Sequence, residues 1–246
     1  MKTLADHQLI YDEDCPMCRV YSGAFIKSQM LDKNGRQNFR DLSLETKSYL
    51  NVARAKNEIA LVNFKEEKVH YGLDSLLVII GNSFPYLEKI GRISFVFWFF
   101  QKLYSVVSYN RKQIIPSKND YLENACVPDF NLKYRMLFLI FGTVLSAFLL
   151  SSISVKFNLE VNFISAFVLI LALFSFQIGS IMKSGFKMIF DYLGNLNTII
   201  IGSSLILFIF SWLNLPEFID QIFAIIVLIL FMAEYFRRIK ILKCRF

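Results

Sequence analysis

The sequence is poor in cysteine and histidine, and its second half is poor in charge. Four cysteines in a chain of 246 residues are too few for a disulfide scaffold. The first 15 residues show no basic start followed by an apolar run, so we expect no cleaved signal peptide. No concentrated basic patch with interleaved aromatic residues occurs, which excludes nucleic acid as the expected partner.

Charge is distributed unevenly along the chain. Residues 1–135 contain 19 Lys and Arg with 15 Asp and Glu, whereas residues 136–246 contain 8 and 5. Hydrophobic residues make up 55% of the whole, 26 of them Phe, and the mean hydropathy is +0.45. These values predict a globular N-terminal part and a C-terminal part that lies in a lipid bilayer.

Four stretches of the second half are long and apolar enough to cross a bilayer, which takes about 20 residues. They are Met136–Val155, Val161–Met182, a span within Leu196–Leu215, and roughly Phe218–Phe236. None contains Cys or His, so the spans offer no ligands for haem or an iron–sulfur cluster. Small residues predict close helix packing, with a lipid or quinone pocket as the open alternative: Gly142, Ser146, Gly179, Ser180, Gly202, Ser203 and Ser204.

The loops between the spans indicate the orientation. Basic residues gather before the first span, between the second and third, and after the fourth: Lys133, Arg135, Lys183, Lys187 and the tail "RRIKILKCR". The opposite loops hold Lys156 with Glu160, and Glu217 with Asp220. The positive-inside rule therefore predicts an integral protein of a cytoplasmic membrane, in our interpretation a bacterial one, with both termini in the cytoplasm.

One apolar segment before the spans leaves two possibilities open. Ile93–Val107 begins with eight residues, seven apolar or aromatic and one serine, then continues into Gln101 and Lys102. It is either an amphipathic helix, on the N-terminal domain or at the membrane interface, or a fifth crossing. A fifth crossing would move the N-terminal part to the outside.

The N-terminal half alternates between strand and helix patterns. Strands are predicted at residues 7–11, 36–44, 57–64 and 68–72, and helices at 15–30, 44–56 and 73–84. The resulting order β-α-β-α-β-β-α is that of a thioredoxin-like domain. A Cys-x-x-Cys pair, Cys15 and Cys18, follows the first strand and opens the first helix, as expected for redox thiols in that fold.

The placement of the pair suits thiol chemistry. A helix N-terminus stabilises a thiolate through its dipole and free N–H groups, so Cys15, exposed at the cap, is the expected nucleophile. Cys18 lies one turn further on and is the expected resolving thiol. The acidic run Asp12–Asp14 acts in the opposite direction, because negative charge raises a thiol pKa. We therefore expect a moderately stabilised thiolate, typical of a reductant or mild exchanger.

The stretch "IYDEDCPMC" resembles the motif Tyr-Asp-Gly-x-Cys-x-x-Cys of the DCC family of thiol-disulfide oxidoreductases. Tyr11, Asp12, Cys15 and Cys18 match, and Glu13 replaces the glycine. The segments "VHYGLDSLLVII" and "LYSVVSYNRKQI", the latter with the pair Asn110-Arg111, extend the similarity over about residues 7–116. The resemblance implies a thioredoxin-like fold and thiol-disulfide oxidoreductase activity.

The supporting residues have more than one interpretation. Asp12 and Asp14 either assist proton transfer or cap the helix, and Arg111 is either their partner or a solvated or lipid-facing charge. The Cys pair could alternatively be half of a zinc site, whose other ligands would come from His7, His70, Cys126 and Cys244. A structural disulfide or an inactive domain are further alternatives.

Together these patterns predict a DCC-type α/β thioredoxin-like domain at residues 1–116, a linker at 117–135 and an all-α four-span membrane domain at 136–246. The expected function is that of an enzyme, a membrane-anchored thiol-disulfide oxidoreductase of the protein-disulfide reductase type. Its catalytic residues would be Cys15 and Cys18, supported by Tyr11, Asp12, Asp14 and Arg111. We expect no cofactor beyond the Cys15–Cys18 disulfide, a protein or small-molecule thiol or disulfide as substrate, and the bilayer as partner. The alternative is a non-catalytic membrane interaction or assembly protein.

Overall fold

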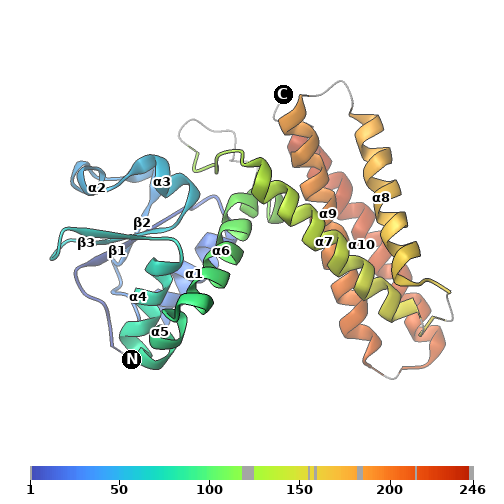
Figure 1. Ribbon diagram of the computed structural model, residues 1–246, viewed down its shortest axis with the longest axis horizontal. Helices are drawn as coiled ribbons and strands as arrows, with labels where there is room; N and C mark the ends of the chain where they lie inside the picture. Colours follow the sequence, from blue (N-terminus) through green and yellow to red (C-terminus); the bar gives the residue numbers. More distant parts are fainter. Residues whose placement is uncertain are drawn as a thin grey trace. The chain divides into compact units, whose positions relative to one another are not determined.

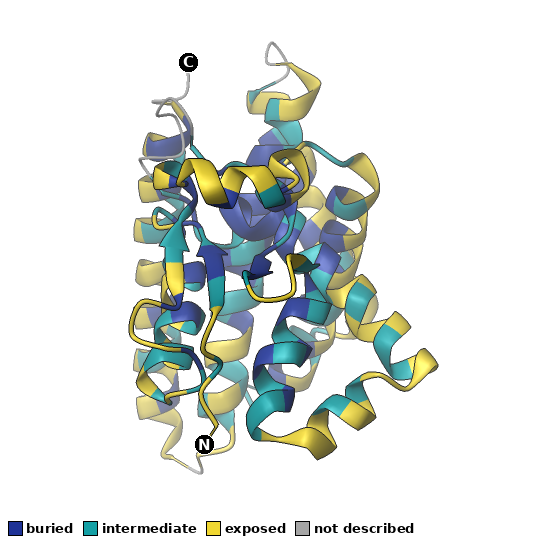
Figure 2. Ribbon diagram, turned by 90° about the vertical axis from the view of Figure 1, so that its left-hand side faces the viewer, coloured by how far each residue is buried: buried dark blue, intermediate teal, exposed yellow. Residues whose placement is uncertain are grey.

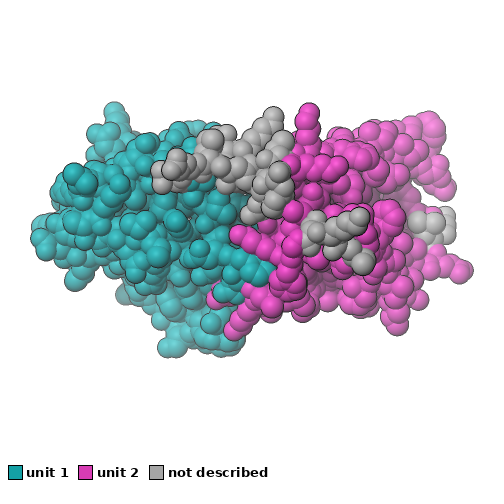
Figure 3. Space-filling view, turned by 90° about the horizontal axis from the view of Figure 1, so that it is seen from above, with its two compact units in different colours: residues 1–131 teal, residues 132–246 magenta. Residues whose placement is uncertain are grey.

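A four-stranded mixed sheet forms the centre of the N-terminal part of the chain (Figure 1). The structure, a computed structural model, describes residues 2–117, 125–154, 156–157, 160–181, 185–213 and 215–243. Two compact units are present, Met1–Asn131 and Leu132–Phe246 (Figure 3).

The elements of the first unit follow the expected order. They are β1 (His7–Tyr11), α1 (Pro16–Lys27), β2 (Arg36–Asn38), the short 3-10 helix η1 (Phe39–Asp41), α2 (Leu44–Tyr49), α3 (Val52–Asn57), β3 (Ala60–Asn63), β4 (Lys68–Tyr71), α4 (Leu73–Ser83), α5 (Pro85–Gly91) and α6 (Ser94–Ile114). The strand order is β2-β1-β3-β4. β2 runs parallel to β1, while β3 is antiparallel to both β1 and β4. The predicted thioredoxin-like fold is confirmed.

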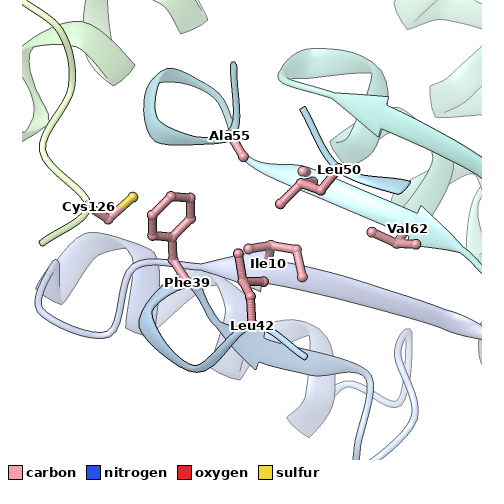
Figure 4. Close-up of a cluster of buried hydrophobic side chains, with 8 residues drawn as sticks. Ile10, Phe39, Leu42, Leu50, Ala55, Val62 and Cys126 are labelled. Atoms are coloured by element: carbon pink, nitrogen blue, oxygen red, sulfur yellow. The ribbon is translucent and has the colours of Figure 1, made fainter. Parts of the chain in front are cut away.

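Two hydrophobic clusters cover the two faces of the sheet. Because successive side chains of a strand point to opposite faces, Leu9 and Ile10 of β1 belong to different clusters. One cluster consists of Ile10, Phe39, Leu42, Leu50, Ala55, Ala60, Val62 and Cys126 (Figure 4). The other consists of Leu9, Leu31, Ile59, Leu61 and Ile79. The helices α2 and α3 contribute to the first cluster and α4 to the second, so the sheet lies between two helical layers.

Two predicted elements are shorter than the patterns indicated. The strand expected at 36–44 ends at Asn38, whose side-chain oxygen accepts from the Arg40 N–H and starts η1. The single helix expected at 44–56 is two helices, α2 and α3. Asn51 interrupts it because its side chain caps α3 by accepting from the Arg54 N–H at 3.0 Å.

The second unit contains four helices long and apolar enough to span a membrane, as predicted. They are α7 (Leu132–Ser154), α8 (Phe163–Ser180), α9 (Phe186–Ser211) and α10 (Glu217–Lys243). The third helix, α9, starts ten residues before the stretch predicted at Leu196–Leu215, because a helix continues through the polar residues that flank a span. α6 is not among these candidate spans, which argues against the fifth crossing.

Polar contacts join α7 to α9 at two levels. Gly142 of α7 lies against Asn197 of α9, whose side-chain amide donates to the Phe138 carbonyl at 2.9 Å. Near one end of the bundle Arg135 pairs with Asp191 at 3.3 Å. Gly142 thus serves the predicted close packing, whereas Gly179 and Gly202 face open space, so the prediction was wrong for them.

The opposite end of the bundle is held by a single lysine. The Lys156 ammonium donates to the carbonyls of Ser211 and Leu213, at 3.1 and 2.7 Å, and pairs with Asp220 at 3.0 Å. These contacts join the segments that follow α7 and α9 to the start of α10.

Gly72, at the start of α4, is a position where we expect substitution to be costly. Its φ is +62°, and an added Cβ would lie 3.0 Å from the Glu58 carboxylate and 3.2 Å from the Tyr104 ring. We predict that Gly72→Ala destabilises the first unit by about 1–3 kcal/mol. Hydrogen exchange of the β3 and β4 amides in the full chain measures this.

Gly23→Ala is the matched control. Gly23 lies inside α1, and its added Cβ would meet nothing closer than Arg36 at 3.6 Å, so the gain in helix propensity should keep or increase protection. Equal protection in the two variants would contradict the prediction.

Candidate active site

The two thiols lie at the start of α1, as the motif predicts. Cys15 is the N-cap residue, and Pro16 occupies the first turn, where its missing N–H leaves no partner unsatisfied. Cys18 lies one turn further along the helix. The Cys15 side chain receives no capping hydrogen bond from the helix, and the two thiols influence each other's pKa. Both are free thiols in this structure.

The predicted exposure of Cys15 at the cap is wrong. Cys15 is 0% exposed and Cys18 is 6% exposed. The cause is the turn that joins β1 to α1, because the Asp12 side chain accepts from the Asp14 N–H at 3.0 Å and its carbonyl accepts from the Cys15 N–H at 3.2 Å. This closed turn keeps the Cys15 sulfur inside the domain.

Each carboxylate of the acidic run has its own partner. Asp12 is buried and its carboxylate lies 2.8 Å from the Lys112 ammonium and 3.7 Å from Arg111 Nε. Glu13 accepts from the Asn38 amide at 2.8 Å. Asp14 forms an ion pair with Arg40.

The motif residues around this turn serve its structure. Glu13 stands where the related motif has glycine, and it is not among the described residues with a positive φ, so the turn needs no glycine. The Tyr11 ring lies beneath the Arg36 guanidinium, 4.9 Å from its centroid, and Arg36 Nη1 donates to Ser22 Oγ at 3.4 Å. The Arg36 side chain of β2 therefore contacts both β1 and α1.

Arg111 is the central cation of the site. It comes from the C-terminal half of α6 and is buried. Its Nη2 donates to the Lys56 carbonyl at 2.8 Å, to the Cys126 carbonyl at 2.9 Å and to the Cys126 sulfur at 3.3 Å. The Arg111 side chain is neither solvated nor lipid-facing. Of the two interpretations of the sequence, the structure agrees with the one in which Arg111 is a partner of Asp12.

The two thiols titrate as a pair. The hydrogen bond from Cys15 lowers the pKa of Cys18 to about 7, with further stabilisation from Arg111 and the Tyr21 hydroxyl against the opposing effects of burial and Asp12. The same hydrogen bond, together with burial, raises the pKa of Cys15. One proton is therefore lost near neutral pH and the second is held between the sulfurs.

The lowered pKa of Cys18 can be compared with the thiol pKa values of redox proteins of this fold. A first pKa near 7 matches the about 7 of thioredoxin and lies far above the about 3.5 of the strongest oxidants in that class. The acidic run does not prevent a thiolate, because its carboxylates have partners of their own and Arg111 lowers the pKa of Cys18.

A small cavity of about 30 Å³, room for about one water molecule, lies beside Cys18. Asp12, Arg111 and Cys126 line it, together with Tyr21 and Tyr104. The site thus holds a small, partly polar space next to Cys18.

Sequence reasoning missed three residues of the site. Tyr21 follows Cys18 at i+3 on α1, a spacing that could have indicated it. Lys112 directly follows Arg111, but two adjacent helical residues do not usually share a partner. Cys126 gave no signal, and the structure places it in the core, where burial raises its pKa to about 11.

The zinc interpretation gains no support from the described part of the chain. His7 contacts the Ala5 carbonyl and His70 the Asp74 carboxylate, at 2.7 and 2.5 Å. Within the residues that the structure describes, no three His, Cys, Asp or Glu side chains gather as metal ligands. Cys244 lies outside those residues.

Comparison with known proteins agrees with the resemblance seen in the sequence. Residues 9–116 match the family model DCC1-like, described as DCC1-like thiol-disulfide oxidoreductase. No curated protein and no solved structure matches the chain. The chain thus carries a DCC1-like thiol-disulfide oxidoreductase domain, followed by four helices apolar enough to span a membrane.

The charge of Arg111 should set the first pKa of the thiol pair. We predict that Arg111→Met raises it by about one unit or more, because the cation stabilises the thiolate and not the thiol. Arg111→Lys keeps the charge and should give an intermediate value. The pH dependence of the thiolate ultraviolet absorbance measures the shift.

Lys27→Met removes an exposed cation from the far end of α1 and is the control, with no shift expected. Equal pKa values for Arg111→Met, Arg111→Lys and the unmodified chain would contradict the role of Arg111.

Proposed function

We propose that this chain, through its DCC1-like domain, is a membrane-anchored thiol-disulfide oxidoreductase that exchanges dithiols and disulfides with Cys15 and Cys18. One observation carries the proposal. The two sulfurs share a hydrogen bond at a helix N-terminus beside a buried arginine, which lowers the pKa of Cys18 to about 7. Such a pair has a reactive thiolate at physiological pH, whereas Cys126, whose pKa burial raises to about 11, has none.

The reaction begins with a proton shift within the pair. Moving the shared proton from Cys15 to Cys18 leaves the negative charge on the Cys15 sulfur, where the N-terminal dipole of α1 stabilises it. This thiolate attacks one sulfur of a substrate disulfide. A Cys15–substrate disulfide forms, and the second substrate sulfur leaves as a thiolate and takes up a proton.

The second step forms the disulfide between the two cysteines. Cys18 loses its proton and attacks the Cys15 sulfur, so the Cys15–Cys18 disulfide forms and the remaining substrate sulfur leaves as a thiol. Two electrons have passed from the cysteine pair to the substrate. The reverse sequence oxidises a dithiol, and a first pKa near 7 favours a reductant or mild exchanger over a strong oxidant.

Access to Cys15 requires the turn before α1 to open. The ion pair between Asp14 and Arg40 and the Asp12 hydrogen bonds hold this turn closed over the sulfur. Protein or small-molecule disulfides that displace these contacts on binding are therefore the expected substrates. The four spans would hold the reaction at a membrane.

The charge pattern of the loops favours a cytoplasmic domain. Basic residues occur at one end of the spans, and the one lysine of the loop after α7 pairs with Asp220 at the other end. This pattern supports a cytoplasmic location for the domain and the two termini.

The order of attack can be tested by trapping. We predict that Cys18→Ser accumulates a mixed disulfide on Cys15 when the full chain reacts with oxidised glutathione, because the resolving thiol is missing. Cys15→Ser should accumulate none. Mass spectrometry of the intact protein detects the adduct, and Cys244→Ser is the control that should exchange normally.

Trapping on Cys18 in the Cys15→Ser variant would reverse the roles of the two thiols. If the unmodified reduced chain exchanges no disulfide, the non-catalytic assembly function replaces the proposed one.

Membrane orientation needs a reporter other than the buried Cys15. In a variant with all four cysteines changed to serine, Leu44→Cys places a thiol on α2, where the native side chain is 87% exposed. Glu160→Cys places one in the loop before α8, where the native residue is exposed. A membrane-impermeant maleimide applied to intact cells should label Glu160→Cys, and Leu44→Cys only after permeabilisation. The opposite result would place the domain outside.

A further inference from the structure

The first unit exposes a large apolar surface on α5 and the N-terminal half of α6. Seven side chains, between 51% and 81% exposed, form what we name the α5–α6 face: Tyr86, Leu87, Ile90, Ile93, Phe95, Trp98 and Phe99. None of these seven residues belongs to a candidate span. A soluble domain rarely exposes so many large apolar residues together, so the face indicates an interaction surface.

The face is a regular feature of the two helices. Phe95, Trp98 and Phe99 recur at i, i+3 and i+4 on α6, and the Phe95 and Trp98 rings stack with their centroids 6.5 Å apart. Val96 and Phe97, between them, are only partly exposed.

The rest of α6 is firmly fixed to the domain. The Tyr104 hydroxyl accepts from the Ile59 N–H at 2.9 Å, and Ser108 donates to the Asn57 carbonyl at 2.5 Å. The orientation of α6 is therefore set by its C-terminal half, and its N-terminal half is presented outward.

We propose that the α5–α6 face is seated in the interfacial layer of the lipid bilayer. Its composition fits that layer, because Trp and Tyr are enriched where headgroups meet acyl chains. Exposed lysines, Lys89 and Lys102, accompany the aromatic residues in these helices and suit anionic headgroups. An amphipathic helix of this kind lies along the membrane surface, with its apolar side inserted by about 5–10 Å.

The length of the connection to the first span supports a bilayer over another partner. Asp129 is part of the first unit, because its carboxylate accepts from the Asn57 amide at 2.7 Å and its N–H donates to the Asn57 side-chain oxygen at 2.8 Å. The span α7 begins at Leu132, three residues later. Three residues reach at most about 10 Å, so this domain is tethered close to a membrane surface.

The polar half of α6 explains why the helix lies on the surface and does not cross. Six polar residues between Ser105 and Gln113 are buried in the domain, Arg111 among them. Crossing would remove them from their partners and place charges in hydrocarbon, which is costly. The helix thus has one half for the bilayer surface and one for the redox site.

The depth of Trp98 tests the proposal in the full chain. The protein has two tryptophans, and Trp212→Phe, at an exposed position, leaves Trp98 as the single reporter. The variant is reconstituted in vesicles of phosphatidylcholine and phosphatidylglycerol with bromine either near the headgroup or near the chain end. We expect at least about twofold stronger quenching by the shallow bromine, in keeping with an interfacial depth.

A matched control separates insertion from mere proximity to the vesicle. Leu44→Trp, in a chain with Trp98→Phe and Trp212→Phe, places the reporter on exposed α2 and should be quenched by aqueous acrylamide, not by brominated lipid. Trp98 quenched by acrylamide alone would show the face in water. Trp98 quenched by neither reagent would show it covered by protein, from this chain or a second copy.

Both of those results overturn the proposal. It does not depend on thiol exchange, because the readout is a depth and not an activity.

Discussion

A buried positive charge is the constraint on which the N-terminal domain depends. Arg111 is held by carbonyl oxygens of Lys56 and Cys126 and faces the Asp12 carboxylate. A guanidinium in such a place is tolerated only when its N–H groups have acceptors and negative charge lies near. The packing of α3, α6 and the segment around Cys126 supplies the acceptors, and Asp12 and the thiol pair supply the charge. Fold and reactivity are therefore two results of the same arrangement.

The helix α6 links this arrangement to the membrane. Its buried C-terminal half delivers Arg111 and Tyr104 to the thiols, and its exposed N-terminal half carries the aromatic residues of the α5–α6 face. A substrate that reaches the pair from the bilayer surface would approach a domain already oriented by that helix. Such an arrangement favours partners that are themselves close to the membrane, since both they and the thiols would lie near its surface.

The local patterns predicted much of this structure. The strand from His7 to Tyr11, the helix start at Pro16 and the four spans follow from periodicity, turn residues and charge, which are local properties. The burial of Cys15 could not be predicted, because it depends on hydrogen bonds within a turn and on an ion pair with Arg40 far along the chain. The place of Cys126 was equally inaccessible, since only the tertiary fold brings it against Phe39 and Ala55. Long-range contacts of buried polar groups leave no periodic trace in a sequence.

The segment around Cys126 has a practical consequence for isolating the domain. The family match ends at residue 116, and a protein cut there would lack the Cys126 carbonyl and the Asp129 carboxylate. Arg111 and Asn57 would each lose a buried acceptor, at a cost of about 1–3 kcal/mol per orphaned group. The autonomous folding unit therefore extends beyond the boundary of the family match, and an excised domain needs the chain through Asn131 to keep its active-site arginine in place.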